Sequence, residues 1–227
     1  IEYRGAWQST VETIAQHSSV PVWNGLTDEW HPTQSLCDMF TMREASGLDD
    51  RDITYAYVGD ARFNVGCSLL MGGALLGMDV RLIAPSKLLP PDSVVRTARE
   101  IADVTGARIT LTEDLGAVRG CRFIHTDIWV SMGEPESVWT ERILLLRDYQ
   151  VNRELLERTG VADVKFMHCL PAYHNRETTV GEAVYQRFGL EELEVTDEVF
   201  ESAASIVFDQ AENRMHSIKA ILVATLT

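Results

Sequence analysis

The chain has 227 residues, of which 45% are hydrophobic and 24% are charged. This composition is ordinary for a folded protein with one large domain or two small ones, and it argues against a disordered chain, collagen or a coiled coil. Asp and Glu outnumber Lys and Arg by 34 to 20, which gives a net charge of -14. Such an acidic chain is a poor candidate for non-specific binding to nucleic acid or to an anionic membrane.

We expect a cytoplasmic protein with reduced thiols, because the sequence shows no membrane-spanning or secretory segment and its cysteine spacing fits no disulfide scaffold. The longest apolar stretch, residues 68–78, is too short to span a bilayer and contains three glycines. Residues 1–19 are mixed and polar, unlike a secretory signal. The four cysteines, at positions 37, 67, 121 and 169, fit neither a zinc ribbon nor a small disulfide scaffold.

Six short apolar runs predict strands that are buried on both faces, as in a parallel sheet. They are Val20–Trp23, Ile53–Val58, Asp79–Ile83, Arg108–Leu111, Phe123–Thr126 and Val164–His168. Amphipathic stretches separate them, and Ser93–Thr105 is the clearest helix, with apolar residues at spacings of three and four. The alternation predicts the α/β class: a doubly wound, mainly parallel sheet with helices on both faces, a three-layer, Rossmann-like fold.

The first candidate site is His31-Pro32-Thr33-Gln34. Pro32 suits the first position of a helix, with His31 as its cap and with Leu36, Met39 and Phe40 as its apolar face. A helix N-terminus offers free backbone N–H groups to an anion, and His and Gln add side-chain donors. From these residues alone, a His-Pro turn without a ligand is the favoured alternative.

A dinucleotide-binding domain would carry G-x-G-x-x-G after the strand Ile53–Val58. The segment Gly59–Gly66 lacks that pattern, so no NAD site is predicted there. Asn64 is expected either to cap the following helix or to point its amide into the crevice at the strand ends.

Two later segments follow predicted strands. Asp127 suits a ligand ammonium, although capping of a following helix is an equally open alternative. Cys169 stands beside His168, as in a nucleophile–base pair, but neighbouring strand residues point to opposite faces, so a hydrolase is a weak hypothesis.

The last helix is predicted to begin with a capping box, Asp209 at the N-cap and Glu212 three residues later. Its apolar stripe is expected to consist of Ala211, Met215, Ile218, Leu222 and Val223. Arg214 lies off that stripe, and from the residues alone a solvated charge is the favoured interpretation.

Taken together, these segments resemble the aspartate/ornithine carbamoyltransferase family, and within it the branch that acts on ornithine. The matching motifs are H-P-T-Q at 31–34, D-I-W-V-S-M-G at 127–133, H-C-L-P at 168–171 and F-D-Q-A-E-N-R-M-H at 208–216. The resemblance implies transfer of a carbamoyl group from carbamoyl phosphate to the δ-amine of ornithine, giving citrulline and phosphate, in arginine metabolism. It also implies a homotrimer or a multiple of trimers, without a metal or an organic cofactor.

The resemblance also implies residue roles. His31 and Arg214 would reach the carbamoyl oxygen, Gln34 and the backbone of Cys169 and Leu170 would meet the carbamoyl amide, and Cys169 and Asp127 would lie near the attacking amine. The implied catalytic residues are Cys169, Asp127, His31 and Arg214. The implied carbamoyl-phosphate ligands are His31, Pro32, Thr33, Gln34, Cys169, Leu170 and Arg214. The implied ornithine ligands are Asn64, Asp127, Ser131 and Met132, with Phe63 standing where relatives often have a second Asn.

Family members begin with a carbamoyl-phosphate domain that would add about a hundred residues, a usual domain size. That domain holds an S-x-R-T phosphate loop, which does not occur in this sequence, and a further phosphate-contacting arginine. The resemblance then divides the chain into a last strand–helix–strand of that domain (1–30), an interdomain helix (31–46), an ornithine-binding domain (47–208) and a C-terminal helix that returns to the first domain (209–227). We expect the 227 residues alone to make no measurable citrulline.

Two alternatives stay open. One is a carbamoyltransferase for a related amine, such as putrescine or N-acylornithine, against which the complete D-I-W-V-S-M-G segment argues. The other is a non-catalytic amino-acid-binding protein, which the missing S-x-R-T loop favours.

Overall fold

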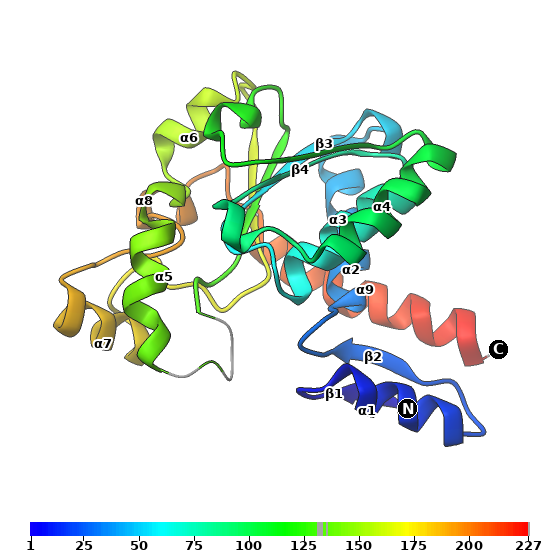
Figure 1. Cartoon of the computed structure of the whole chain (residues 1–227). Coiled ribbons are helices and arrows are strands. Elements are labelled where there is room, and N and C mark those ends of the chain that lie inside the picture. Colours follow the sequence, from blue (N-terminus) through cyan, green and yellow to red (C-terminus); the bar gives the residue numbers. More distant parts are fainter. Residues whose placement is uncertain (131–133, 135, 227) are drawn as a thin grey trace.

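The computed structural model describes residues 1–130, 134 and 136–226 (Figure 1). Its main sheet has the order β5-β4-β3-β6-β7, and every neighbouring pair is parallel. The strands are β3 (Thr54–Val58), β4 (Asp79–Ile83), β5 (Arg108–Thr112), β6 (Phe123–Thr126) and β7 (Lys165–His168). The chain adds strands first on one side of β3 and then on the other, so the topological switch point lies between β3 and β6. The predicted doubly wound fold is confirmed.

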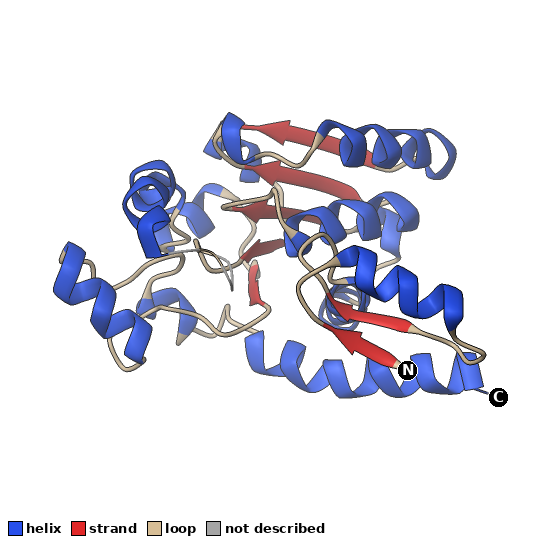
Figure 2. Cartoon of the chain, turned by 60° about the horizontal axis from the view of Figure 1, so that its bottom comes forward, coloured by secondary structure: helices blue, strands red, loops and turns tan. Residues whose placement is uncertain are grey.

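Helices cover both faces of this sheet (Figures 1 and 2). Along β3, Tyr55 and Tyr57 belong to one buried apolar cluster, and Ala56 and Val58 belong to a second one, as alternation of side chains across a sheet requires. The helices are α1 (Gln8–His17), α2 (Pro32–Ser46), α3 (Asn64–Leu76), α4 (Asp92–Thr105), α5 (Trp139–Leu146), α6 (Arg153–Arg158), α7 (Thr179–Phe188), α8 (Asp197–Phe200) and α9 (Val207–Leu226). The described part of the chain contains no helix with the length and hydropathy needed to cross a membrane.

A separate small sheet lies at the N-terminus, where β1 (Glu2–Arg4) and β2 (Trp23–Leu26) pair in parallel and α1 connects them. This is the expected strand–helix–strand (Figure 2). The strand predicted over Val20–Trp23 begins only at Trp23, whose N–H donates to the Ile1 carbonyl at 2.8 Å. Pro21 has no N–H to give to a ladder, which explains the later start.

Helices α2 and α9 pack against each other, and the faces that they bury are largely polar. The predicted apolar face of α2 is confirmed only for Met39, which is buried, because Leu36 is 46% and Phe40 39% exposed. Side chains buried between the two helices pair by hydrogen bonds instead, for example from Asn213 Nδ2 to Thr41 Oγ1 at 3.1 Å. A buried polar face is stable when its groups are paired in this way.

The start of α9 also differs from expectation. The helix begins at Val207, so Asp209 lies in its first turn rather than at the N-cap. Its predicted apolar stripe is largely exposed, with Met215 at 53% and Val223 at 62%, whereas Gln210 and Asn213 are buried. Apolar periodicity therefore identified the wrong face of this helix.

Candidate functional site

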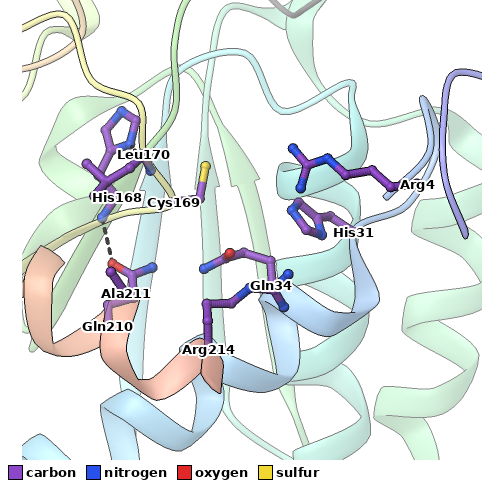
Figure 3. A pocket seen from close by; sticks show the side chains of 9 residues that line it. All are labelled: Arg4, His31, Gln34, His168, Cys169, Leu170, Gln210, Ala211 and Arg214. Carbon is purple, nitrogen blue, oxygen red and sulfur yellow. Dashed lines mark hydrogen bonds between the residues drawn. The ribbon is translucent and has the colours of Figure 1, made fainter. Parts of the chain in front are cut away.

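The carboxyl end of β7, the first turns of α2 and α9, and the end of β1 meet around a pocket of about 170 Å³ (Figure 3). Five residues that the sequence singled out lie there together: His31, Gln34, Cys169, Leu170 and Arg214. The other lining residues are Arg4, His168, Gln210 and Ala211. Residues more than 200 positions apart in the sequence therefore form one site.

Two arginines give this pocket its positive charge. Arg214 lies on α9, and its Nη1 is buried with no hydrogen-bond partner among the described residues, so it is not the solvated charge expected from composition. Arg4, at the end of β1, was missed by sequence reasoning because a three-residue strand gives no periodic signal. Two guanidinium groups at one pocket suit an anionic ligand such as a phosphate.

His31 caps α2, as predicted, and Pro32 is the first residue of the helix. The His31 backbone N–H donates to Ser68 Oγ at 2.8 Å, which fixes the entry of the chain into the helix. Burial, followed by the charges of Arg214 and Arg4, lowers the pKa of His31 to about 3. The imidazole is therefore neutral at pH 7, with one N–H to donate and one nitrogen to accept.

Two glutamine side chains of the pocket share one buried acceptor. Gln34 Nε2 donates to Asp38 Oδ1 at 2.7 Å, and Gln210 Nε2 donates to the same oxygen at 2.6 Å. Gln210 Oε1 in turn accepts the His168 backbone N–H at 2.9 Å. The neighbouring Thr33 points elsewhere and donates to the Gly25 carbonyl at 3.2 Å.

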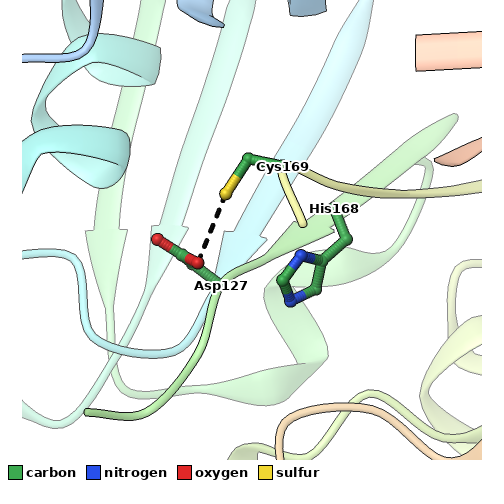
Figure 4. Close-up of side chains that lie close together, drawn as sticks. All are labelled: Asp127, His168 and Cys169. Carbon is green, nitrogen blue, oxygen red and sulfur yellow. Dashed lines mark hydrogen bonds between the residues drawn. The ribbon is translucent and has the colours of Figure 1, made fainter. Parts of the chain in front are cut away.

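Asp127 and Cys169 lie side by side at the ends of β6 and β7 (Figure 4). The Cys169 thiol donates to Asp127 Oδ1 at 3.3 Å, and the Ile128 N–H donates to the same oxygen at 2.8 Å. The next helical turn among the described residues begins at Glu136, so Asp127 caps no helix and the capping alternative is wrong.

Burial raises the pKa values of both side chains in this pair. The Asp127 pKa lies above its usual value, and the negative charge of Asp127 adds to burial in raising the Cys169 pKa well above its own. The thiol therefore stays protonated at neutral pH. Since the thiolate is the nucleophilic form, this arrangement argues against covalent catalysis by Cys169.

His168 lies nearer to Cys169 than strand alternation predicts, because Cys169 is already beyond the end of β7. Ligating atoms of Asp127, His168 and Cys169 lie within 4.8 Å of one another, a set that could offer O, N and S ligands to a metal. However, His168 Nδ1 accepts the Leu170 N–H at 2.9 Å, and Nε2 lies 3.4 Å from Glu194 Oε1. His168 Nδ1 is thus engaged within the fold, Nε2 faces a carboxylate without a hydrogen bond to it among the described residues, and the thiol donates to Asp127.

Of the predicted ornithine ligands, Asn64 and Asp127 lie among the described residues, and neither lines the pocket. Asn64 is the first residue of α3, and its Nδ2 donates to the Thr27 carbonyl at 2.7 Å instead of lining the pocket. Phe63 precedes it at the N-cap position, with the Arg62 guanidinium 5.0 Å from its ring centroid. Ser131 and Met132 lie outside the described residues.

A buried ion-pair network, not foreseen from the sequence, connects the segments that follow β3 and β6. Asp60 accepts from Arg62 at 2.8 Å and also pairs with Arg142 of α5. Arg142 pairs in addition with Glu134 at 2.8 Å. Because the Asp60 and Arg142 side chains are only 3% and 7% exposed, this network holds two loops at the switch point together.

Comparison with known proteins agrees with this geometry. Residues 51–225 match the Asp/Orn binding domain of aspartate/ornithine carbamoyltransferases, and residues 1–44 match the carbamoyl-P binding domain of the same enzymes. The chain belongs to the aspartate/ornithine carbamoyltransferase family.

Solved structures of this family superpose on most of the chain. Ornithine carbamoyltransferase from Gloeobacter violaceus is 35% identical over 98% of this chain, with a TM-score of 0.81, and the match covers 68% of that protein. The Pyrococcus furiosus enzyme is 37% identical over 96% of this chain, with a TM-score of 0.82 and 63% of its own length covered. The anabolic enzyme from Campylobacter jejuni is 29% identical over 99% of this chain, with a TM-score of 0.86 and 68% of its length covered. The chain thus spans about two thirds of these relatives.

Proposed function

We propose that this chain serves the transfer of a carbamoyl group from carbamoyl phosphate to the δ-amine of ornithine, giving citrulline and phosphate. The observation that carries the proposal is a pocket with two arginines, a neutral histidine and a glutamine, next to the Asp127–Cys169 pair. The first group of side chains suits a carbamoyl phosphate, and the second suits an amine.

The chemistry follows from these groups. Attack of a neutral amine on the carbamoyl carbon places negative charge on the carbonyl oxygen before phosphate leaves. The N–H groups of His31 and Arg214 are donors for that oxygen in a partly buried site, where hydrogen bonds to a developing oxyanion lower the barrier. Alignment of the two substrates in adjoining sites supplies the rest of the rate enhancement.

Asp127 suits the amino-acid side of the reaction. A carboxylate beside the pocket can accept a charge-assisted hydrogen bond from a substrate ammonium. The Cys169 thiol donates a hydrogen bond to the Asp127 carboxylate, and this bond holds the carboxylate in place at the strand ends. The S-M-G motif at 131–133 favours ornithine over putrescine or an acylated ornithine, although it lies outside the described residues.

Calorimetry tests this proposal. We expect ornithine and its unreactive analogue norvaline to bind, and putrescine and aspartate to bind at least tenfold more weakly, which corresponds to about 1.4 kcal/mol. Binding of ornithine without any binding of carbamoyl phosphate would favour the non-catalytic alternative. A citrulline assay run beside it tests the separate expectation that the 227 residues alone, without an S-x-R-T loop, give no measurable turnover.

A further inference from the structure

Asp38 lies on α2 one helical turn after Gln34, and it does not itself line the pocket. It is 1% exposed, and a single oxygen of its carboxylate receives the NH2 groups of both Gln34 and Gln210. Charged side chains are rarely this buried without a specific set of partners. The question is what this carboxylate does for the two glutamines.

An ionised carboxylate can only accept hydrogen bonds, so each carboxamide must present its NH2 group to Asp38 and turn its oxygen away. For Gln210 the result is visible in Figure 3, since its oxygen accepts the His168 N–H at the end of β7. For Gln34 the oxygen is left for the pocket that this residue lines. Without Asp38, the Gln34 carboxamide could turn over and present NH2 instead.

The pocket then has two sides of opposite hydrogen-bonding character. His31 and Arg214 offer donors, and Gln34 offers an acceptor. A carbamoyl group matches this arrangement, because its oxygen accepts and its NH2 donates. An acetyl group has the oxygen but a methyl in place of NH2, and so leaves the Gln34 oxygen without a donor.

We propose that Asp38 is the positioning residue that makes this pocket selective for a carbamoyl over an acetyl group, by fixing the Gln34 carboxamide with its oxygen toward the ligand. This inference rests on the proposed function, because it takes the carbamoyl group as the ligand.

The test compares two stable ligands that differ only in this group: phosphonoacetamide, and 2-oxopropylphosphonate, in which CH3 replaces NH2. At pH 8, above the pKa of about 7 to which burial raises Asp38, the wild-type chain should bind the amide roughly 5- to 100-fold more tightly, the usual effect of one unmade buried hydrogen bond. Asp38→Leu should bring the ratio of the two affinities, for phosphonoacetamide over 2-oxopropylphosphonate, close to one. Asp38→Asn should keep most of it, because Gln210, fixed by the His168 N–H, holds the Asn oxygen in the accepting position.

Thr41→Val is the matched control for loss of a buried polar group between α2 and α9, since Thr41 is equally buried on α2, donates to the Cys37 carbonyl and accepts from Asn213, but forms no hydrogen bond with either glutamine. It should leave the ratio unchanged. An unchanged ratio in Asp38→Leu, or an equal loss in Thr41→Val, would overturn the positioning role.

A measurement on the wild-type chain keeps the inference testable if Asp38→Leu does not fold. By NMR, the side-chain NH2 groups of Gln34 and Gln210 should exchange slowly with solvent before any ligand is added. Phosphonoacetamide should then shift the Gln34 side-chain carbonyl carbon more than its NH2 group. Rapid exchange of both NH2 groups, or a response confined to the Gln34 NH2, contradicts the role of Asp38, whereas slow exchange without binding of either phosphonate contradicts the proposed function alone.

Discussion

His168 and Glu194 form a fully buried pair, with Nε2 3.4 Å from Oε1 and with both side chains 0% exposed. His168 Nδ1 accepts the Leu170 N–H, so in the neutral ring Nε2 carries the proton and faces the carboxylate. Glu194 Oε1 also accepts the Tyr173 N–H at 2.6 Å. These contacts hold Leu170 at φ 56, a left-handed conformation that a leucine rarely adopts, where its backbone borders the pocket.

The first prediction concerns this pair. Glu194→Gln removes the negative charge of the carboxylate that accepts the Tyr173 N–H and faces His168 Nε2, and since hydrogen bonds to a charged acceptor are the stronger ones, we expect the free energy of unfolding to fall by about 1–3 kcal/mol. Glu154→Gln is the control, because its ion pair with Arg158 is 71% and 48% exposed and should contribute less than about 1 kcal/mol. Denaturant unfolding measures both, and equal effects would show that the pair does not support the turn.

The second prediction concerns the pH dependence of stability. The native pKa of His31 is about 3, below the usual 6.5, so between these values the unfolded chain binds a proton that the native chain does not. Stability should therefore fall with decreasing pH, by up to about 1.4 kcal/mol per pH unit for this group. His31→Gln removes the contribution of His31 to this pH dependence. His125, whose pKa is also lowered to about 3, is present in both proteins, so its contribution drops out of the difference between them. Unfolding measured at pH 7, 6, 5 and 4 should show the stability of the variant rising relative to that of the wild type as the pH falls. A difference in unfolding free energy that does not change with pH contradicts the burial of a neutral His31.

The third prediction concerns Cys169. Its raised pKa should make alkylation by iodoacetamide at pH 8 much slower in the native than in the unfolded chain. Asp127→Asn removes the negative charge that opposes the thiolate, so alkylation of Cys169 should become faster in this variant. Mass spectrometry of the modified peptide gives both rates, and a carbamoyl-cysteine adduct formed with carbamoyl phosphate would show a nucleophile instead.

The sheet could be predicted because four of its strands are mostly apolar and buried on both faces, whereas the same prediction for β5, R-I-T-L-T, is wrong: this edge strand has no fully buried residue. Asp79–Ile83 and Phe123–Thr126 have the predicted bounds, and α2 begins at Pro32 because proline suits the first helical turn. The buried faces of helices α2 and α9 could not be predicted from apolar residues in the same way. Their contact depends on pairs such as Thr41 with Asn213, 172 positions apart, whose polar side chains leave no apolar period.

For the site, the motifs H-P-T-Q and H-C-L-P located the pocket but not its supporting residues. Asp38, Glu194 and Arg142 resemble ordinary surface charges in the sequence, and only the fold shows that their partners are buried. Arg4 was missed for a different reason, since its strand is too short to be predicted.

The fourth prediction concerns the network at the switch point. Arg142→Met leaves the buried Asp60 carboxylate with Arg62 alone and removes the pairing of Arg142 with Glu134. A buried charge left with no partner costs about 3–5 kcal/mol of unfolding free energy; because Asp60 keeps Arg62, we expect Arg142→Met to cost less than this but more than the loss of an exposed pair. Arg153→Met is the control, because the Arg153–Glu198 pair is 63% and 55% exposed and should contribute about 1 kcal/mol or less. Similar melting temperatures for the two variants would contradict a structural role for the network.

The fifth prediction tests the amino-acid site directly. Asp127→Asn keeps the shape of the side chain and an oxygen for the Ile128 N–H, but it removes the charge. A charge-assisted hydrogen bond contributes about 1.5–3 kcal/mol, so ornithine and norvaline should bind roughly 10- to 150-fold more weakly. Phosphonoacetamide should bind as before, because Asp127 does not line the pocket of His31, Gln34 and Arg214. Calorimetric titration gives both affinities. Equal losses for norvaline and phosphonoacetamide would mean that Asp127 supports the strand ends, through Cys169, without contacting the amino acid.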